Sequence, residues 1–271
     1  MPTVQELYEL WATEAYPELK ASLEQSLEPR GLESLRETFA SLDPQPGQVV
    51  VDIGARDAVG AIRLAQQHGL RAVAVDPVPL HCERARQAVA EAGLEDRIEV
   101  VEGAIEDLPL ADASVDWIWC RDVLVHVDVR RGLAECERVL RPGGAMVAHV
   151  TLATERLEPR EAAELAALAA IVPESFTAAA IEAAAAEAGF ITREEDVIGS
   201  EWRERALEDG DWDAAGTLLA IARLDRQRPE LVEHYGAIAV DVARNGFLWG
   251  IYQLLGKLCP TVYVWSKTSS A

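Results

Sequence analysis

The feature that most constrains the fold is an alternation of apolar, strand-like runs with helix-like segments between residues 49 and 150. The first run, VVVDIGARDAVG at residues 49–60, leads from an apolar strand through a glycine turn into a helix. The next, VAVDPVP, ends its apolar part on Asp76. Such alternation predicts a parallel sheet covered on both faces, with a ligand crevice at the carboxyl ends of the strands.

Seven strands are expected along the chain. They cover residues 49–53, 72–75, 98–101, 115–120, 145–150, 191–198 and 261–265. VLRPGG, at residues 139–144, has the proline and glycine of a tight turn before the fifth strand. The fold class expected is therefore α/β: a Rossmann-like, seven-stranded, mostly parallel sheet with helices on both faces, N-terminal helices and a helical insertion before the last strand.

The net charge of −21 comes from 46 acidic and 25 basic residues. Long-range repulsion opposes binding to phosphate backbones and anionic lipid surfaces, so we expect neither nucleic acid nor a membrane as a partner. The apolar stretch 246–264 is interrupted by Lys257 and Pro260, which favours a buried helix followed by a core strand over a membrane span. The amino terminus shows no secretion signal, which predicts a cytoplasmic location.

Neither a metal site nor a disulfide framework is expected. The cysteines form no CxxC pair, and no histidines stand at zinc-ligand spacing from them. These cysteines are Cys82, Cys120, Cys136 and Cys259.

The glycine turn indicates which kind of nucleoside ligand is bound. A dinucleotide fingerprint needs three glycines, whereas Arg56 and Val59 stand where the second and third would be. No lysine and hydroxyl residue follow Gly60, which excludes a Walker loop. What remains is a ligand that has a nucleoside but no phosphate at the turn.

Several linked motifs across residues 40–200 resemble those of the class I S-adenosylmethionine-dependent methyltransferases. VVVDIGAR resembles the family's first motif, VAVDPVP its ribose-binding acid, and EGAIEDLP its adenine loop. VDWIWCRDVLVHV resembles the fourth strand and its exit, and VLRPGG the turn before the fifth strand. The resemblance implies methyl transfer from S-adenosyl-L-methionine to a small-molecule acceptor.

The resemblance also implies which residues bind the cofactor. Asp52 and the turn at Gly54 and Ala55 hold the cationic methionyl part, Asp76 accepts from both ribose hydroxyls, and the main chain leaving the fourth strand meets the amino-acid end. The full set expected is Asp52, Gly54, Ala55, Arg56, Asp76, Pro77, Ile105, Glu106, Cys120 and Arg121.

Two departures from the family pattern concern this set. Arg56 and Ala58 replace later glycines of the first motif, so Arg56 either points away from the cofactor or contacts its carboxylate. In the adenine loop, Ala104 and Ile105 replace an acid and a small residue. The hydrogen bond to the adenine amino group is then missing, or it comes from Glu106.

Three residues are candidates for catalysis. His126 follows the fourth strand, near the acceptor position of many small-molecule members of the family, and either acts as a base or caps its segment. His149, near the end of the fifth strand, is either a site residue or buried in the core. Asp122 is either a site residue or a helix N-cap. His81 is interpreted as structural.

Acceptor selection is assigned to helices added to the common core, whose aromatic residues either form a lid or pack the helices together. The lid candidates are Tyr8, Trp11, Tyr16, Tyr235, Trp249 and Tyr252. Such a lid favours a small, largely apolar metabolite. A prenyl diphosphate is less favoured because no compact basic cluster is evident, unless Arg223, Arg226 and Arg228 converge.

The expected organisation follows. Residues 1–40 form an N-terminal helical lid, 41–200 the cofactor-binding core, 201–260 a helical cap, and 261–271 the last strand and tail. A homodimer is a further expectation.

Two alternatives to methyl transfer remain: a protein of this fold that binds the cofactor but acts as a cyclase or non-catalytic partner, and an NAD(P)-dependent oxidoreductase.

Overall fold

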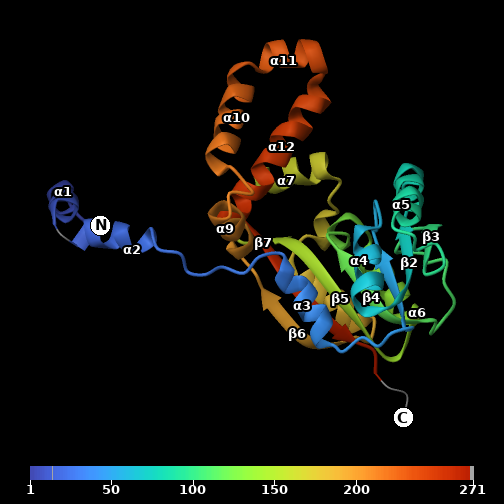
Figure 1. Cartoon of the computed structure of the whole chain (residues 1–271). Coiled ribbons are helices and arrows are strands. Elements are labelled where there is room, and N and C mark those ends of the chain that lie inside the picture. The colour runs from blue at the N-terminus through green and yellow to red at the C-terminus, as the bar shows by residue number, and fades with distance from the viewer. Residues whose placement is uncertain (14, 269–271) are drawn as a thin grey trace.

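A seven-stranded sheet with the strand order β3-β2-β1-β4-β5-β7-β6 lies at the centre of the protein (Figure 1). The computed structural model describes residues 1–13 and 15–268. The strands are β1 Val49–Ile53, β2 Arg71–Asp76, β3 Ile98–Glu102, β4 Val115–Arg121, β5 Leu140–Ala153, β6 Ile191–Val197 and β7 Leu258–Ser266. The expected seven-stranded α/β fold is confirmed, with five parallel strands and antiparallel pairing only at β7.

The register of the parallel strands brings their carboxyl ends together. Asp52 of β1 lies opposite Ala74 of β2 on one side and Trp119 of β4 on the other. Because β2 ends at Asp76 and β4 at Arg121, the chain leaves these three strands along one edge of the sheet.

The turn expected at 139–144 lies inside β5 as an irregularity. Leu140 pairs with Val115, and the next pair joins Ala145 to Trp117, so four residues of β5 bulge where β4 has one. Gly143 takes a φ of +81°, and a side chain on Gly144 would meet the Asp116 carbonyl oxygen. The two glycines therefore allow the chain to turn without leaving the sheet.

Helices cover both faces of the sheet, because side chains alternate along each strand. Val50 packs in one buried cluster with residues of α3, α4 and α5, while Val51 and Ile53 pack in the other with α6, α7 and α8. The helices are α1 Val4–Ala12, α2 Ala15–Leu23, α3 Glu33–Ser41, α4 Val59–His68, α5 Pro79–Glu91, α6 Val129–Val139, α7 Pro159–Ala169, α8 Ala178–Glu187, α9 Glu201–Glu208, α10 Ala214–Arg226, α11 Arg228–Tyr235 and α12 Ala237–Leu254. Two 3₁₀ turns, η1 Leu124–His126 and η2 Pro173–Ser175, complete the chain.

The expected helical insertion is present between β6 and β7. Helices α10, α11 and α12 form a projection above the sheet, and the end of α12 returns to it (Figure 1). There Tyr252 is buried in the core, and β7 follows, as the pattern at 246–264 predicted. Among the described residues, no helix is both long and apolar enough to cross a membrane.

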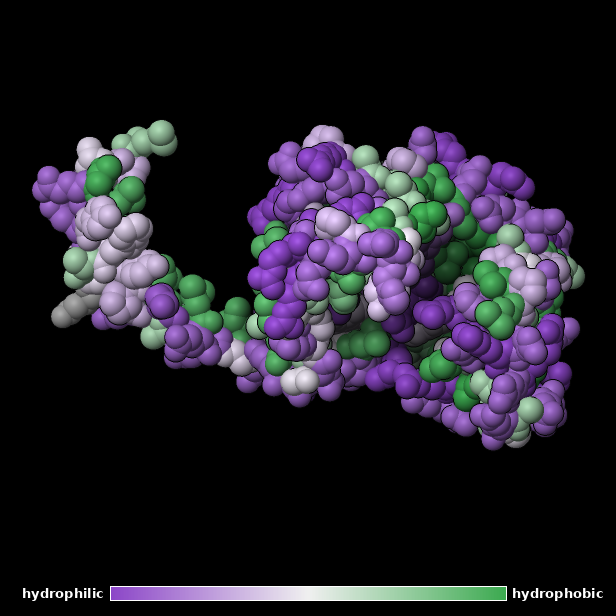
Figure 2. Space-filling model, turned by 90° about the horizontal axis from the view of Figure 1, so that it is seen from above, coloured by the Kyte–Doolittle hydropathy of each residue, from purple (hydrophilic) through white to green (hydrophobic). Residues whose placement is uncertain are grey.

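An N-terminal arm, residues 1–30, extends away from the body (Figures 1 and 2). Its helix α1 begins with a capping box, in which the Thr3 hydroxyl accepts from the Glu6 N–H and the Glu6 carboxylate accepts from the Thr3 N–H. Arg30 anchors the base of the arm through ion pairs to Asp196 at 2.6 Å and Glu201 at 2.7 Å. The chain then enters α3, which packs on the sheet.

Candidate functional site

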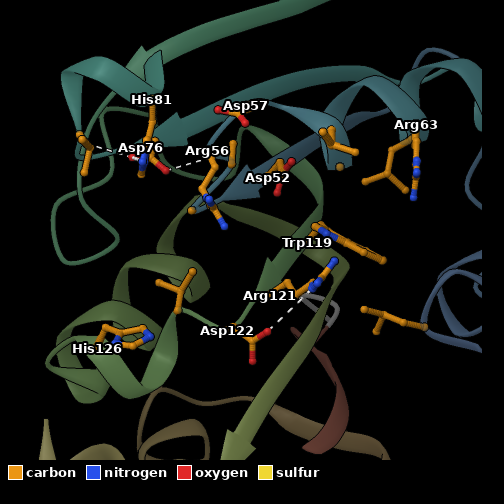
Figure 3. Close-up of a pocket in the computed structure, with 18 of the residues that line it drawn as sticks. Asp52, Arg56, Asp57, Arg63, Asp76, His81, Trp119, Arg121, Asp122 and His126 are labelled. Carbon is orange, nitrogen blue, oxygen red and sulfur yellow. Dashed lines mark hydrogen bonds and ion pairs between the residues drawn. The ribbon is translucent and has the colours of Figure 1, made fainter. Parts of the chain in front are cut away.

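A cavity of about 930 Å³ lies at the carboxyl ends of β1, β2 and β4 (Figure 3). The turns that follow these strands form its floor, and α3 and the first part of α4 line one side. Arg56, in the turn after β1, and His126 of η1 lie on different sides of it (Figure 3). This is the crevice that βαβ topology places at the strand ends.

The turn after β1 has the backbone typical of a glycine-rich loop, although two of its three left-handed positions are not glycine. Gly54, Arg56 and Ala58 all take positive φ values, of +72°, +49° and +56°. The left-handed conformation costs a residue with a side chain about 1–2 kcal/mol, so Arg56 and Ala58 retain a shape that glycine would adopt more easily. A side chain on Gly54 would collide with Val123.

Backbone hydrogen bonds tie this turn to β2. The N–H groups of Gly54 and Ala55 both donate to the Val75 carbonyl oxygen, at 2.9 and 3.1 Å. These two N–H groups are therefore not available as donors to a ligand. A cationic ammonium group needs no such donor and suits a turn that offers a backbone carbonyl oxygen.

Asp76, at the end of β2, is buried but lines the cavity. Its Oδ2 accepts from the Arg56 N–H at 2.9 Å, and its Oδ1 accepts from the Val78 N–H at 3.0 Å. Nδ1 of His81 lies 3.0 Å from the same Oδ1. A carboxylate has about four lone-pair positions, so these three contacts leave about one open, and about two when the His81 side chain moves away.

Asp52 is 4% exposed, and its Oδ2 accepts a hydrogen bond of 2.7 Å from the Ala61 N–H at the start of α4. Burial raises the pKa of Asp52 to about 7, although the Ala61 hydrogen bond and the charge of Arg121 oppose the shift. The carboxylate lines the cavity without an ion-pair partner among the described residues. A cation that entered beside Asp52 would favour its charged form.

We expect Asp52→Asn to reduce the pH dependence of stability. The pKa is about 7 in the folded protein against about 3.8 for the ordinary group, so the folded state binds the additional proton between these values. The stabilising contribution is therefore lost as the pH rises towards and through 7. Between pH 6 and pH 8 Asp52 should lower the free energy of unfolding by about 1 kcal/mol.

Urea unfolding at both pH values measures this effect. The exposed Asp96→Asn is the control, because it removes a carboxylate of the same kind outside the cavity. An equal pH dependence in wild type and Asp52→Asn would contradict the assignment.

Asp122, directly after β4, lines the cavity with a strained backbone, at a φ of +55°. Its N–H donates to the His149 carbonyl oxygen at 2.8 Å, and its Oδ1 accepts from the Thr151 hydroxyl at 3.1 Å. Burial raises the pKa of Asp122, but the charges of His149 and Arg121 and the Thr151 hydroxyl together hold it below its usual value. Asp122 is therefore no helix N-cap, because the residue that precedes η1 is Val123.

His149 is buried beneath Asp122 and does not line the cavity. Its Nδ1 lies 3.2 Å from Asp122 Oδ1, yet neither ring nitrogen makes a hydrogen bond of good geometry with the described residues. The ring stacks on Trp202 of α9 with centroids 4.7 Å apart. The catalytic role of His149 stays a prediction. Its ring does not reach the cavity, but it lies beside Asp122, which does.

His126 lines the cavity from η1. Its Nδ1 lies 3.1 Å from the Ala170 carbonyl oxygen, which accepts only, so this nitrogen carries the proton. In the neutral ring Nε2 then keeps its lone pair. This orientation leaves His126 able to accept a proton at Nε2.

The other residues that the sequence predicted to bind the cofactor divide into two groups. Gly54, Ala55, Arg56, Pro77 and Arg121 line the cavity with Asp52 and Asp76. Three others do not, and their role stays a prediction. Ile105 is buried against Gly132, the Glu106 carboxylate accepts from the Asp128 N–H at 3.3 Å, and Cys120 is buried in the core.

None of the six lid aromatics lines the cavity in this structure. Tyr8, Trp11 and Tyr16 are exposed on the arm, and Tyr235 is exposed at the end of α11. Trp249 and Tyr252 pack in the core cluster beneath the cap. The role of the six residues as a lid stays a prediction. For Trp249 and Tyr252 the structure shows the alternative, which is packing in the core.

The structure adds residues that the sequence did not single out. His81, expected to be structural, contacts Asp76 inside the cavity. Arg36 of α3 and Arg63 of α4 line it as well. Arg223, Arg226 and Arg228, whose convergence would have favoured a diphosphate ligand, lie outside it on α10 and α11. Leu32, Leu35 and Arg36 share a helical spacing that marks one face of α3, but nothing in that spacing says what the face meets.

Comparison with known proteins agrees with this geometry. Residues 51–148 match a family described as a methyltransferase domain. A dimethylglycine N-methyltransferase of Parasynechococcus marenigrum (strain WH8102) is 36% identical over 118 residues, which are 43% of this chain and 42% of the relative. A sarcosine/dimethylglycine N-methyltransferase of Halorhodospira halochloris is 38% identical over 114 residues, 41% of each chain. The chain thus spans less than half the length of these curated relatives.

Solved structures extend the likeness of the fold to almost the whole chain. A putative sarcosine dimethylglycine methyltransferase from Galdieria sulphuraria has a TM-score of 0.68 at 20% identity, over 88% of this chain and 86% of that one. The [4+2]-cyclase SpnF has a TM-score of 0.66 at 17% identity, over 91% and 86%. At these identities the likeness establishes the fold alone. Residues 51–148 of this chain thus match a methyltransferase domain, within a fold that the solved structures share over almost the whole chain.

Proposed function

We propose that this protein transfers the methyl group of S-adenosylmethionine to a small-molecule acceptor. The observation that carries the proposal is the pair of buried carboxylates, Asp52 and Asp76, that line one cavity at the strand ends of the matched methyltransferase domain. The cavity of about 930 Å³ is at the upper end of the range for small-molecule sites, which suits a cofactor and an acceptor together.

The cavity residues fit the cofactor in three respects. Asp76 offers a carboxylate for the ribose hydroxyls once His81 releases Oδ1. The carbonyl side of the turn at Gly54 offers acceptors for an ammonium group. Asp52, buried without an ion-pair partner, offers a compensating charge for a cation. The lack of a side chain at Gly54 lets Val123, which follows β4, lie close to this turn.

When bound, the cofactor supplies an electrophilic methyl group on a sulfonium. The protein's part is to hold the acceptor in line with that group and to keep its nucleophilic atom unprotonated. His126 is the residue proposed for the second task, because Ala170 fixes its ring and leaves Nε2 free to accept a proton. Asp122, supported by Thr151 and His149, is proposed to position a polar group of the acceptor.

We propose a small amine as the acceptor class, because the curated relatives reported above are named for dimethylglycine and sarcosine. The experiment is calorimetry with S-adenosylmethionine, followed by mass spectrometry of the reaction with glycine, sarcosine and N,N-dimethylglycine. Formation of S-adenosylhomocysteine that depends on an acceptor supports the proposal. Cofactor binding without turnover, across these amines and a panel of apolar scaffolds, favours the cyclase or partner-protein alternative, and no cofactor binding contradicts both.

A closing lid is proposed for the N-terminal arm. Its large apolar side chains are exposed, Trp11 at 53% and Leu23 at 76%, and helices this short gain most of their stability from packing. The arm leads directly into α3, which lines the cavity. Deleting residues 1–27 is expected to lower kcat/KM about tenfold or more through exposure of the reacting groups to water.

Trp11→Ser provides the point variant, with Leu218→Ser, on the exposed face of α10, as its control. Unchanged kinetics in both arm variants would exclude the lid. A homodimer and a cytoplasmic location stay predictions, and light scattering of the full chain measures the first.

A further inference from the structure

We propose that His81 is a positioning residue that competes with the ribose of the cofactor for Asp76. This role rests on the proposed function and adds a step to it, because the His81 ring must leave the Asp76 carboxylate before both ribose hydroxyls can bind there. His81 then acts through Asp76 and takes no part in the methyl transfer itself.

The first turn of α5 brings the His81 ring to Asp76. Val78 is the N-cap of this helix, so residue 81 stands at its third position, from which a side chain reaches back towards the residues before the helix. The N–H groups of His81 and Cys82 both donate to the Val78 carbonyl oxygen, at 2.9 and 3.1 Å, which fixes this turn. Nδ1 of the ring thus lies 3.0 Å from Asp76 Oδ1, on one wall of the cavity (Figure 3).

The acceptor capacity of Asp76 does not accommodate His81 and two hydroxyl groups together. The Arg56 N–H, the Val78 N–H and the His81 ring make three contacts with a carboxylate that has about four lone-pair positions. Two ribose hydroxyls would bring the donors to about five. Once the ring leaves, the two N–H groups and the two hydroxyls together match the capacity of the carboxylate.

Of the three contacts, the one from His81 is the contact that can be released. The donors of Arg56 and Val78 are backbone N–H groups, held by the turn after β1 and by the start of α5. The His81 side chain is 28% exposed, against 6% for Asp76, and can rotate about its own bonds. Its departure therefore requires no change in the backbone.

The protonation state of the ring decides how strongly His81 competes. Imidazole rings gain a proton between pH 5 and pH 8, and an imidazolium adds an ion pair to the hydrogen bond. Over residues 1–13 and 15–268, Asp76 is the only acid within ion-pair distance of the His81 ring. The other charged groups that line this part of the cavity or surround the adjacent Cys82 are Asp52, Arg56, Asp57, Arg63, Arg86 and Glu102. The ribose should therefore bind more tightly as the pH rises.

The test is calorimetry with adenosine and 2′,3′-dideoxyadenosine at pH 6 and pH 8. These nucleosides differ only in the two ribose hydroxyls, and they carry no cation that would respond to the charge of Asp52. The proteins are wild type, His81→Leu, which removes the contact, and His81→Asn, which keeps an N–H donor that does not titrate. His234→Leu is the control, because His234 is exposed on α11 outside the cavity. Thermal unfolding checks the fold of each variant.

We expect wild type and His234→Leu to bind adenosine about threefold more tightly at pH 8 than at pH 6. At pH 6, His81→Leu should bind it about tenfold more tightly than wild type, and His81→Asn should have the same affinity at both pH values. Neither change should extend to 2′,3′-dideoxyadenosine, which has no hydroxyl for Asp76 to accept from.

The failure of this role can be told apart from the failure of the proposed function. An adenosine affinity in His81→Leu that is equal to or weaker than that of wild type at pH 6 overturns the competition. Equal gains for 2′,3′-dideoxyadenosine overturn it as well, because the ribose hydroxyls would then not be what His81 displaces. Wild type is also titrated with S-adenosylhomocysteine, and no binding there defeats both the competition and the proposed function.

Discussion

Replacing Asp76 with alanine is expected to lower the affinity for S-adenosylmethionine by about 100-fold or more. A carboxylate that accepts hydrogen bonds from ribose hydroxyls makes charge-assisted contacts, each worth about 1.5–3 kcal/mol. The substitution also frees the Arg56 N–H, which Asp76 now holds at 2.9 Å, so the turn after β1 loses one of its three hydrogen bonds to the end of β2. Calorimetry with the cofactor measures the change.

Two controls separate loss of the ribose contact from loss of the turn. Asp76→Asn keeps an acceptor oxygen and nearly the same volume, so it should retain the fold and lose about tenfold in affinity. Asp96→Ala removes an exposed acid outside the cavity and should leave binding unchanged. An affinity in Asp76→Ala within about threefold of wild type would exclude Asp76 from the cofactor site.

Gly60→Ala is expected to lower the free energy of unfolding by about 2 kcal/mol, although alanine is the better helix former. A Cβ on Gly60 would lie 2.5 Å from Asp52 Oδ2 and 3.2 Å from its Cγ. The carboxylate would have to leave the Ala61 N–H, and two buried polar groups would lose their partner at about 1–3 kcal/mol each. The gain of about 1 kcal/mol in helix propensity offsets only part of this cost.

Gly246→Ala is the matched control for this substitution. Gly246 also lies within a helix, α12, but a Cβ there meets no atom within 4 Å. The control should therefore stabilise the protein by about 0.5–1 kcal/mol, so that the same change has opposite signs at the two positions. Chemical denaturation measures both, and a stabilised Gly60→Ala would show that Asp52 moves freely and does not depend on Ala61.

The fold was largely predictable because its signals are local. Valines at 49–51 and at 73 and 75 mark strands, and the turns and helices between them alternate at βαβ spacing. The position of β7 between β5 and β6 could not be predicted from such local signals. Its pairing with β5 joins residues more than 100 positions apart, such as Ala145 and Ser266, and no local pattern encodes such a register.

The candidate site was predicted where it depends on strand ends and not where it depends on helix packing. Asp52, Asp76 and the turn at Gly54 follow strands whose ends meet at one edge, so their common location could be inferred from the sequence. Arg36 and Arg63 are 27 positions apart on two helices, and only the packing of Leu35 and Leu64 brings them to one cavity. The contact of His81 with Asp76 depends likewise on how α5 leaves β2.

The sequence by itself determined the order of the site-forming elements along this chain. These are an apolar strand, the turn at residues 54–58, a second strand that ends in an acid, and a methyltransferase pattern through residue 148. Those features depend on neighbours in the chain. Only the tertiary structure decided that burial raises the pKa of Asp52 to about 7, that Ala170 orients the His126 ring, and that arginines from two helices share the cavity. The physical reason is that burial, hydrogen bonding and charge balance are set by groups that are distant in sequence and meet only when the helices pack on the sheet.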